Sequence, residues 1–135
     1  MASAAVHPQY SLRDLTAASE IIVEGRVTRS WTAWDAKHLY IWTHHAVQTS
    51  DVLKGLRSGS VTVSEPGGTI GDVHQLFSGT VSYAVGEQVV LFLYRTPVGY
   101  LRTRGGAQGK VSVGSGASLT VLDRQIRDLV KREAH

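Results

Sequence analysis

Residues 21–28 read IIVEGRVT, and their side chains alternate between two chemical types. One face of an extended chain would carry Ile21, Val23, Gly25 and Val27, and the other would carry Glu24, Arg26 and Thr28. A period of two is typical of a strand that buries one face. The segment therefore predicts a strand that begins at Ile21 and runs to about Trp31.

A second, longer strand is predicted over residues 38–52, after a polar, turn-like connection at residues 32–37. Bulky side chains occupy both of its faces, so the alternation does not decide which face points into the protein. One face holds Leu39, Ile41, Thr43, His45 and Val47, and the other holds Tyr40, Trp42, His44, Ala46 and Gln48. The two strands together predict a long hairpin.

Shorter apolar runs, separated by glycine and proline, continue this pattern along the chain. The most apolar run, residues 88–94, predicts a central strand that is covered on both faces. The other runs predict strands at residues 61–63, 73–77, 100–104, 110–113 and 119–121. Gly25 and Gly86 could relieve strain where a strand of a barrel bends.

Helices are predicted at both ends of the chain. Ser11 can cap the first, because Asp14 follows three residues later as in a capping box. The second is expected from about Asp123, with an apolar stripe of Ile126, Leu129 and Val130. The sequence therefore predicts one mainly β domain over residues 1–135, a five- or six-stranded OB-like barrel with a short N-terminal helix and a C-terminal helix.

The composition excludes several classes of protein. The chain has 135 residues, a net charge of +3 and no cysteine. It therefore has no disulfide framework, thiol nucleophile or zinc site built on thiolates. Its 14 Lys and Arg residues are scattered, so nucleic acid is not expected as the main partner. No apolar run reaches the ~18 residues of a membrane-spanning helix, so no membrane span is predicted.

The N-terminus indicates export from the cell. Residues 2–5 read ASAA, which matches the small-residue A-x-A pattern of a signal-peptidase site. Residues 1–4 are therefore expected to be a signal-peptide remnant or residues added for expression. The mature protein is expected to be secreted or periplasmic.

Patterns that would indicate catalysis or a cofactor are lacking. There is no G-x-S-x-G motif, and the glycine-rich residues 67–71 lack the G-K-[ST] ending of a phosphate loop. His44 and His45 are adjacent on a strand and face opposite sides, so they cannot bind one ion together. A metal site would need His74 to approach one of them. The sequence predicts no enzyme activity, no catalytic residues, no metal and no cofactor.

Aromatic residues gather near the tip of the predicted hairpin. Trp31 and Trp34 flank the tip, and Trp42 follows on the next strand. They could cap the core of the barrel, or they could lie at its rim and contact a partner. Trp34 is expected to be the most exposed of them.

Five ordered segments resemble a bacterial family of small secreted proteins of unassigned function. They are residues 15–27, 51–55, 66–68, 85–93 and 106–110. The same layout resembles the netrin-like OB barrel of the tissue inhibitors of metalloproteinases. Here residues 6–9 resemble the N-terminal segment of the inhibitors, residues 21–23 their first strand, and residues 53–55 the end of their second strand.

The second resemblance implies a protein partner, namely a secreted zinc protease whose cleft would accept the N-terminus and a neighbouring loop. The implied contact residues are Ala5, Val6, His7 and Pro8 at the N-terminus and Gly67, Gly68, Thr69 and Ile70 in the loop, with Trp34 as the exposed aromatic of the tip. The inhibitors chelate the protease zinc through a disulfide-bonded N-terminal cysteine, which this chain lacks. The resemblance therefore supports the fold more strongly than the activity.

Two functions remain open from the sequence. The first is a secreted, non-catalytic protein-binding module, which includes a metalloprotease inhibitor. The second is an OB-fold domain that binds a polymer, either polysaccharide or nucleic acid, through a rim of Trp31 and Trp34 together with Arg102 and Arg104.

Overall fold

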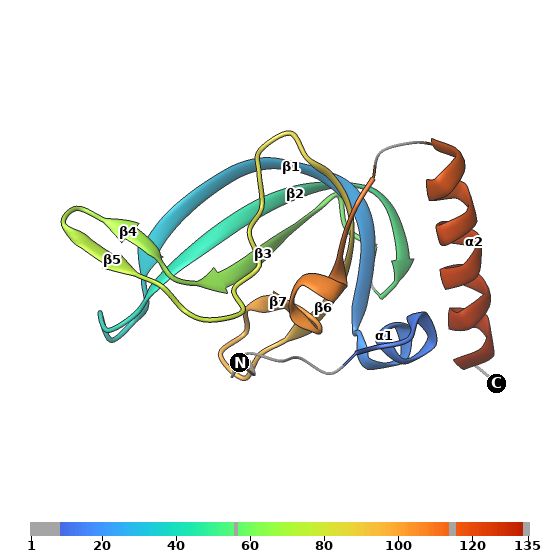
Figure 1. Cartoon of the computed structure of the whole chain (residues 1–135), viewed down its shortest axis with the longest axis horizontal. Helices are drawn as coiled ribbons and strands as arrows, with labels where there is room; N and C mark the ends of the chain where they lie inside the picture. Colours follow the sequence, from blue (N-terminus) through green and yellow to red (C-terminus); the bar gives the residue numbers. More distant parts are fainter. Residues whose placement is uncertain (1–8, 56, 114–115, 134–135) are drawn as a thin grey trace, which may run out of the picture.

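A computed structural model describes residues 9–55, 57–113 and 116–133 of the chain (Figure 1). Its longest feature is an antiparallel pair of strands, β1 (Ile21–Trp34) and β2 (Ile41–Lys54), each of 14 residues. The register between them shifts at three places along β1, and such irregularities bend and twist a strand. A side chain at Gly25 would overlap the carbonyl group of Gln48, so the strand pair needs glycine there.

The other long strands complete a six-stranded sheet. β3 (Ser60–Pro66) is antiparallel to β2, as expected for a meander of the first three strands. β6 (Gln88–Arg95) is antiparallel to β7 (Leu101–Thr103), to β8 (Lys110–Ser112) and to β1. The order in the sheet is β1-β2-β3-β7-β6-β8, with the additional pairing of β1 to β6. The neighbours β3 and β7 are parallel and pair at Val63 and Leu101.

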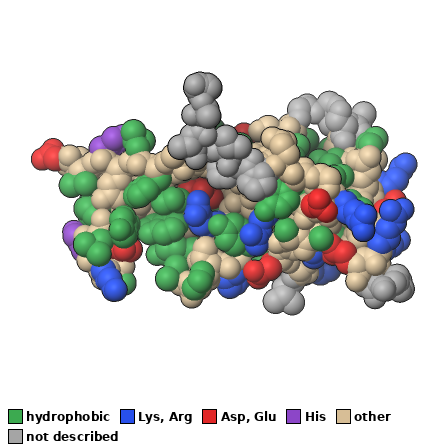
Figure 2. All heavy atoms as spheres, turned by 60° about the horizontal axis from the view of Figure 1, so that its bottom comes forward, with side chains coloured by type: hydrophobic (Ala, Val, Ile, Leu, Met, Phe, Trp, Pro, Cys, Tyr) green, Lys and Arg blue, Asp and Glu red, His purple; other side chains and the backbone are tan. Residues whose placement is uncertain are grey.

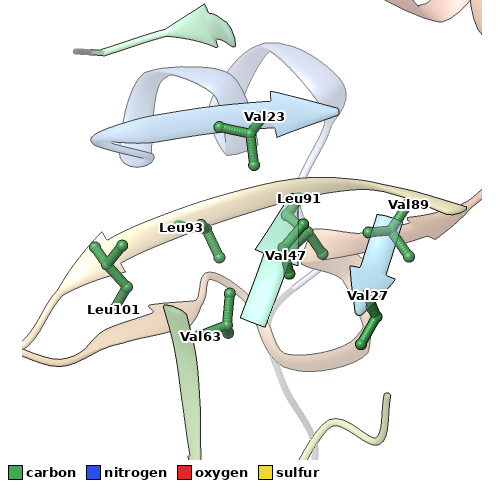
Figure 3. Close-up of a cluster of buried hydrophobic side chains, with 8 residues drawn as sticks. All are labelled: Val23, Val27, Val47, Val63, Val89, Leu91, Leu93 and Leu101. Atoms are coloured by element: carbon green, nitrogen blue, oxygen red, sulfur yellow. The ribbon is translucent and has the colours of Figure 1, made fainter. Parts of the chain in front are cut away.

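The main apolar core lies between these strands (Figure 3). It consists of Val23, Val27, Val47, Val63, Val89, Leu91, Leu93 and Leu101. Residues 89–93 of β6 are all buried, which confirms the prediction of a central strand covered on both faces. In β2, Ile41, His45 and Val47 are buried, so the structure decides which face of this strand points inward.

A second apolar cluster lies under the two helices, α1 (Leu12–Ala18) and α2 (Gly116–Glu133). Its buried members are Leu15, Ile22, Leu53, Val90, Phe92 and Ile126. The Ser11 side chain accepts a hydrogen bond from the Asp14 amide at 3.0 Å, which confirms the predicted cap. In Figure 1 both helices lie at one end of the molecule.

Several local predictions were wrong. β1 continues to Trp34, so residues 32–34 belong to this strand and not to the predicted connection. Residues 119–121 are not a strand but belong to α2, because Leu119 and Leu122 pack on the cluster of Ile126 at helical spacing while Val121 stays exposed. Gly86 does not bend a strand either. It lies in the turn before β6 with a φ of +93° and open space around its α-carbon.

The remaining elements are short. β4 (Gly68–Ile70) and β5 (Val73–Gln75) form a separate hairpin at the end of the molecule away from the helices (Figure 1). The short 3₁₀ helix η1 (Gly106–Gly109) precedes β8. No helix within the described residues has the length and apolar character needed to cross a membrane.

Candidate functional site

The loop between β1 and β2 is held in shape by Asp35. Its carboxylate accepts hydrogen bonds from the amides of Leu39, at 2.7 Å, and Tyr40, at 3.2 Å. The Asp35 amide in turn donates to the carbonyl of Tyr40, at 2.8 Å. Desolvation raises the pKa of Asp35, but the amides of Leu39 and Tyr40 outweigh it and lower the pKa below its ordinary value. The loop therefore has a defined conformation that depends on one ionised side chain.

The β4–β5 hairpin is attached to this loop by hydrogen bonds. The Gly67 amide donates to the carbonyl of Ile41 at 2.8 Å, and the Thr32 hydroxyl donates to the carbonyl of Thr69 at 3.2 Å. The Gln75 side chain joins the two segments twice, since it accepts from the Ile41 amide and donates to the Leu39 carbonyl. Loop and hairpin thus form one continuous tip.

Large apolar side chains are exposed on this tip. They are Leu39, Tyr40, Val73, Leu76 and Phe77, which we call the tip patch, and their exposed fractions range from 38% for Phe77 to 82% for Leu76. The rings of Tyr40 and Phe77 meet edge to face, with centroids 6.1 Å apart. Figure 2 shows hydrophobic side chains gathered over this end, whereas charged side chains gather over the opposite end. Apolar groups concentrated in this way on an otherwise polar surface are typical of a binding site.

The structure brings part of the predicted site to this tip. Trp34 is half-buried and stacks on the ring of His38, with centroids 4.2 Å apart. Of the loop residues, Gly67 is buried, Gly68 and Ile70 are half-buried, and Thr69 is exposed.

The other predicted contact residues, Ala5, Val6, His7 and Pro8, lie outside the described residues. Close to the first described residue, the Tyr10 amide donates to the side-chain oxygen of Gln108 at 2.7 Å. Tyr10 is therefore held beside the 3₁₀ helix η1.

Sequence reasoning missed the apolar residues that dominate the tip. Leu39 and Tyr40 were placed on opposite faces of a strand, but they precede β2 and belong to the loop. Leu76 and Phe77 follow a strand that ends at Gln75, two residues earlier than predicted. The only signal for them in the sequence was their apolar character in segments rich in polar residues.

A cavity of about 250 Å³ lies beneath the tip patch. It is lined by Thr43 and His45 of β2, by residues 65–68, which include the predicted contact residues Gly67 and Gly68, and by residues 75–77 and 80–83 at the end of β5 and in the segment that follows it. His45 is buried, with its ring 4.6 Å from that of Tyr83 and its Nδ1 atom 2.6 Å from the Ser30 hydroxyl. Burial, together with the charges of His44 and Lys110, lowers the pKa of His45 to about 4. The ring is therefore neutral at physiological pH.

The second ionisable group in the cavity wall, Glu65, is 1% exposed. Its carboxylate accepts hydrogen bonds from the amide of Thr103 at 3.2 Å, from the hydroxyl of Thr103 at 3.1 Å and from Arg102 at 3.3 Å. The Tyr83 hydroxyl lies 2.5 Å from the Thr103 hydroxyl, and burial raises the pKa of Tyr83. The buried carboxylate is thus paired with Arg102 and bonded to Thr103.

Of the two tryptophans predicted for the alternative polymer site, Trp31 lies in a strip of rings along β1 and β2, whereas Trp34 stacks on His38. Arg29 lies 4.2 Å above the ring of Trp31, which is 5.5 Å from the ring of His44. Tyr100 contacts both His44 and Trp42, at centroid distances of 5.4 and 4.8 Å. The two arginines predicted for this site have other contacts. Arg102 pairs with the buried Glu65, and Arg104 lies 4.0 Å above the ring of Tyr94.

A group of carboxylates lies between α2 and the strands, at the end of the molecule away from the tip (Figure 1). Burial, with a hydrogen bond and the charge of Asp123, raises the pKa of Glu24 to about 7. Asp51 forms an ion pair with Arg127 of α2. Across the described part of the chain, no three His, Asp or Glu side chains are arranged to hold a metal ion.

No protein-family model and no curated protein sequence matches this chain.

Proposed function

We propose that this protein is a secreted, non-catalytic module that binds a protein partner through the tip patch. One observation carries the proposal. Hydrogen bonds to the Asp35 carboxylate order the loop, and in this ordered loop the side chains of Leu39 and Tyr40 are exposed to solvent. Exposing apolar side chains in an ordered loop costs free energy unless a partner covers them. Because the loop is already ordered, little conformational entropy is lost when the partner binds.

The strand pairings support a finer assignment of the fold, to an OB-type barrel. β1 pairs with both β2 and β6, so the pairings link five strands in a ring of β1, β2, β3, β7 and β6. An OB fold is a five-stranded Greek-key barrel that binds ligands through its loops and one strand face. We infer a netrin-like version of this barrel from the resemblance to the metalloproteinase inhibitors.

A secreted zinc protease is the partner that this resemblance favours. Residues 5–8 and 67–70 would enter its cleft, and residues 67–70 lie beside the tip patch through the contacts of Gly67 and Thr69. The absence of cysteine means that the N-terminal amine would have no disulfide to position it. We therefore expect the tip patch to supply more of the binding energy than the N-terminus does.

The proposal that the protein is no enzyme agrees with the chemistry of its hydroxyl–imidazole contacts. Ser30 lies against His45, Ser64 against His44 and Thr69 against His74. Burial lowers the pKa of His45 to about 4, so this ring is a weak general base near neutral pH, and burial also lowers the pKa of His44.

The test measures binding and inhibition against a panel of purified secreted zinc proteases. The double variant Leu39→Ser/Phe77→Ser should bind the protease at least about tenfold more weakly, since both substitutions remove an apolar contact with the partner. Val98→Ser is the matched control, because Val98 is 74% exposed but lies in the turn between β6 and β7. A chain that begins at Ala5 tests whether the free amine adds inhibition. Binding unaffected by the double variant would contradict the role of the tip patch.

Polymer binding is the second candidate, and the continuous strip of Trp31, His44, Tyr100 and Trp42 favours it. Aromatic rings beside an arginine can stack on bases or sugar rings. A binding assay with an oligosaccharide array and with single-stranded DNA at two salt concentrations tests it. Nucleic-acid binding would weaken steeply with salt, whereas sugar stacking would not. Loss of binding in Trp31→Ala, but not in Leu39→Ser, would assign the polymer to the strip.

A further inference from the structure

We propose that the cavity beneath the tip patch is a binding site for a small, uncharged, apolar group of about the size of one six-membered ring. The inference does not depend on the tip patch being a protein interface. It rests on the volume of the cavity, on the hydrogen bonds of its polar walls and on the way it opens to solvent.

The volume of the cavity sets the size of the ligand. At about 250 Å³ it is larger than the ~150 Å³ apolar cavity that is sufficient for benzene, and smaller than the pockets of drug-sized ligands, which begin near 300 Å³. One ring with a short substituent therefore fits. Val81, Phe77 and Leu76 supply apolar walls, and the ring of Tyr83 supplies another.

Four polar side chains of the wall already have partners inside the protein. Thr43 donates to the carbonyl of Gly67, and Thr80 donates to the carbonyl of Pro66. Gln75 is bonded at both its oxygen and its nitrogen to the Leu39–Ile41 backbone. Tyr83 is bonded to Thr103. A ligand with several strong hydrogen-bonding groups would lose its water and find these four side chains already bonded, which costs free energy.

Charge in the wall does not favour an ionic ligand. His45 is neutral near pH 7, since burial lowers its pKa to about 4. Glu65 is ionically paired with Arg102 and accepts two hydrogen bonds from Thr103. An anion would meet the Glu65 carboxylate, and a cation would compete with Arg102 for it. The walls therefore select an uncharged ligand.

The ligand has a route into the cavity. Leu76 and Phe77 line it and are 82% and 38% exposed, so they lie where it meets solvent. Val81, at 6% exposed, lines the buried part. A ligand would thus pass two apolar side chains before it reached the interior.

The experiment is a methyl and aromatic NMR titration of the full chain with three probes of one size, toluene, phenylacetate and benzylammonium. Toluene should produce saturable shifts at Val81, Phe77 and Tyr83, and the two charged probes should bind at least about tenfold more weakly, because they must lose their hydration. Val81→Phe fills the cavity and should abolish the toluene shifts. Val98→Phe, the same substitution at an exposed position of the β6–β7 turn that does not line the cavity, should leave them unchanged.

Three results would overturn the inference. They are the lack of saturable shifts with toluene, equal binding of the charged probes, and toluene binding that survives in Val81→Phe. Should Val81→Phe fail to fold, Thr80→Phe narrows the cavity from its exposed rim and takes its place. Leu39→Ser separates this site from the proposed function, because it should weaken partner binding and leave the toluene titration unchanged.

Discussion

At the scale of single residues, Asp35 connects loop order to the proposed binding surface. We expect Asp35→Ala to speed amide hydrogen exchange at Leu39 and Tyr40, because both amides lose their acceptor. Asp35→Asn keeps one acceptor oxygen, so its amide exchange rates should lie between those of Asp35→Ala and those of the native protein. Exchange measured by NMR decides the point, and unchanged protection in Asp35→Ala would show that the backbone alone shapes the loop.

His45 makes stability depend on pH on the acid side. Its pKa lies near 4 in the folded protein and near 6.5 in the unfolded chain, so the unfolded state binds more protons between these values. Stability should therefore fall as the pH drops below about 6.5, by about 2 kcal/mol at pH 4.5. Denaturant unfolding at pH 7.5 and 4.5 measures this loss. His45→Gln should show a smaller loss over the same interval, and an equal loss would assign the effect to other groups.

Gly25 tests whether close approach of two backbones fixes the strand pair. Gly25→Ala places a methyl group against the carbonyl of Gln48 and should destabilise the fold by about 2 kcal/mol or more. Gly59→Ala is the matched control, because its added methyl group meets open space. Chemical denaturation of both variants checks the difference, and similar midpoints would mean that the strands move apart easily.

At the scale of elements, the attachment of α2 should weaken as the pH rises. The pKa of Glu24 is raised to about 7 against an ordinary value of 4.5, so the folded state keeps a proton that the unfolded state releases. The associated stability is present below about pH 4.5 and is lost as the pH rises through about 7.

Glu24→Gln keeps the shape of the side chain and removes its charge. We expect it to flatten the pH dependence of unfolding between pH 5 and 8 and to slow amide exchange in α2 at pH 8. Arg26→Gln, at an exposed position of the same strand, is the control. A pH profile unchanged by Glu24→Gln would exclude the carboxyl pair as its source.

Elements with a strong local pattern could be predicted, and those without one could not. β6 was found because its run of apolar residues is buried on both faces, and α1 because Ser11 and Asp14 form a cap. The start of α2 was missed because residues 119–121, LTV, alternate over too short a span to distinguish a strand from the first turns of an amphipathic helix.

At the scale of the whole molecule, the pairing of β3 with β7 should be the least protected part of the sheet. One residue pair, Val63 with Leu101, joins these strands, whereas six pairs join β1 to β6. We therefore expect the amides of β7 to exchange faster than those at residues 89–93 of β6. Amide exchange in β7 as slow as in β6 would show that the six-stranded sheet opens as one unit.

The candidate site could not be read from the sequence, because it is assembled from distant segments. The tip patch combines the loop at residues 35–40 with residues 73–77, and the hydrogen bonds of Gln75 bring them together. The cavity adds Glu65 and Tyr83, which neither share a strand nor lie near each other in the chain. Trp34 and residues 67–70 do lie at the tip, and their aromatic or glycine-rich character is visible locally in the sequence, but their role as contact residues stays a prediction.

The way the β4–β5 hairpin is attached has a consequence for sequence change. Its two strands meet the rest of the protein through backbone groups and the side chains of Thr32 and Gln75, and they contribute no residue to either apolar cluster. The turn between Ile70 and Val73 can therefore vary without disturbing either apolar cluster, provided that the left-handed conformation of Gly71, with a φ of +56°, is kept. One scaffold could in this way present many different recognition surfaces, as antibody domains do with their loops.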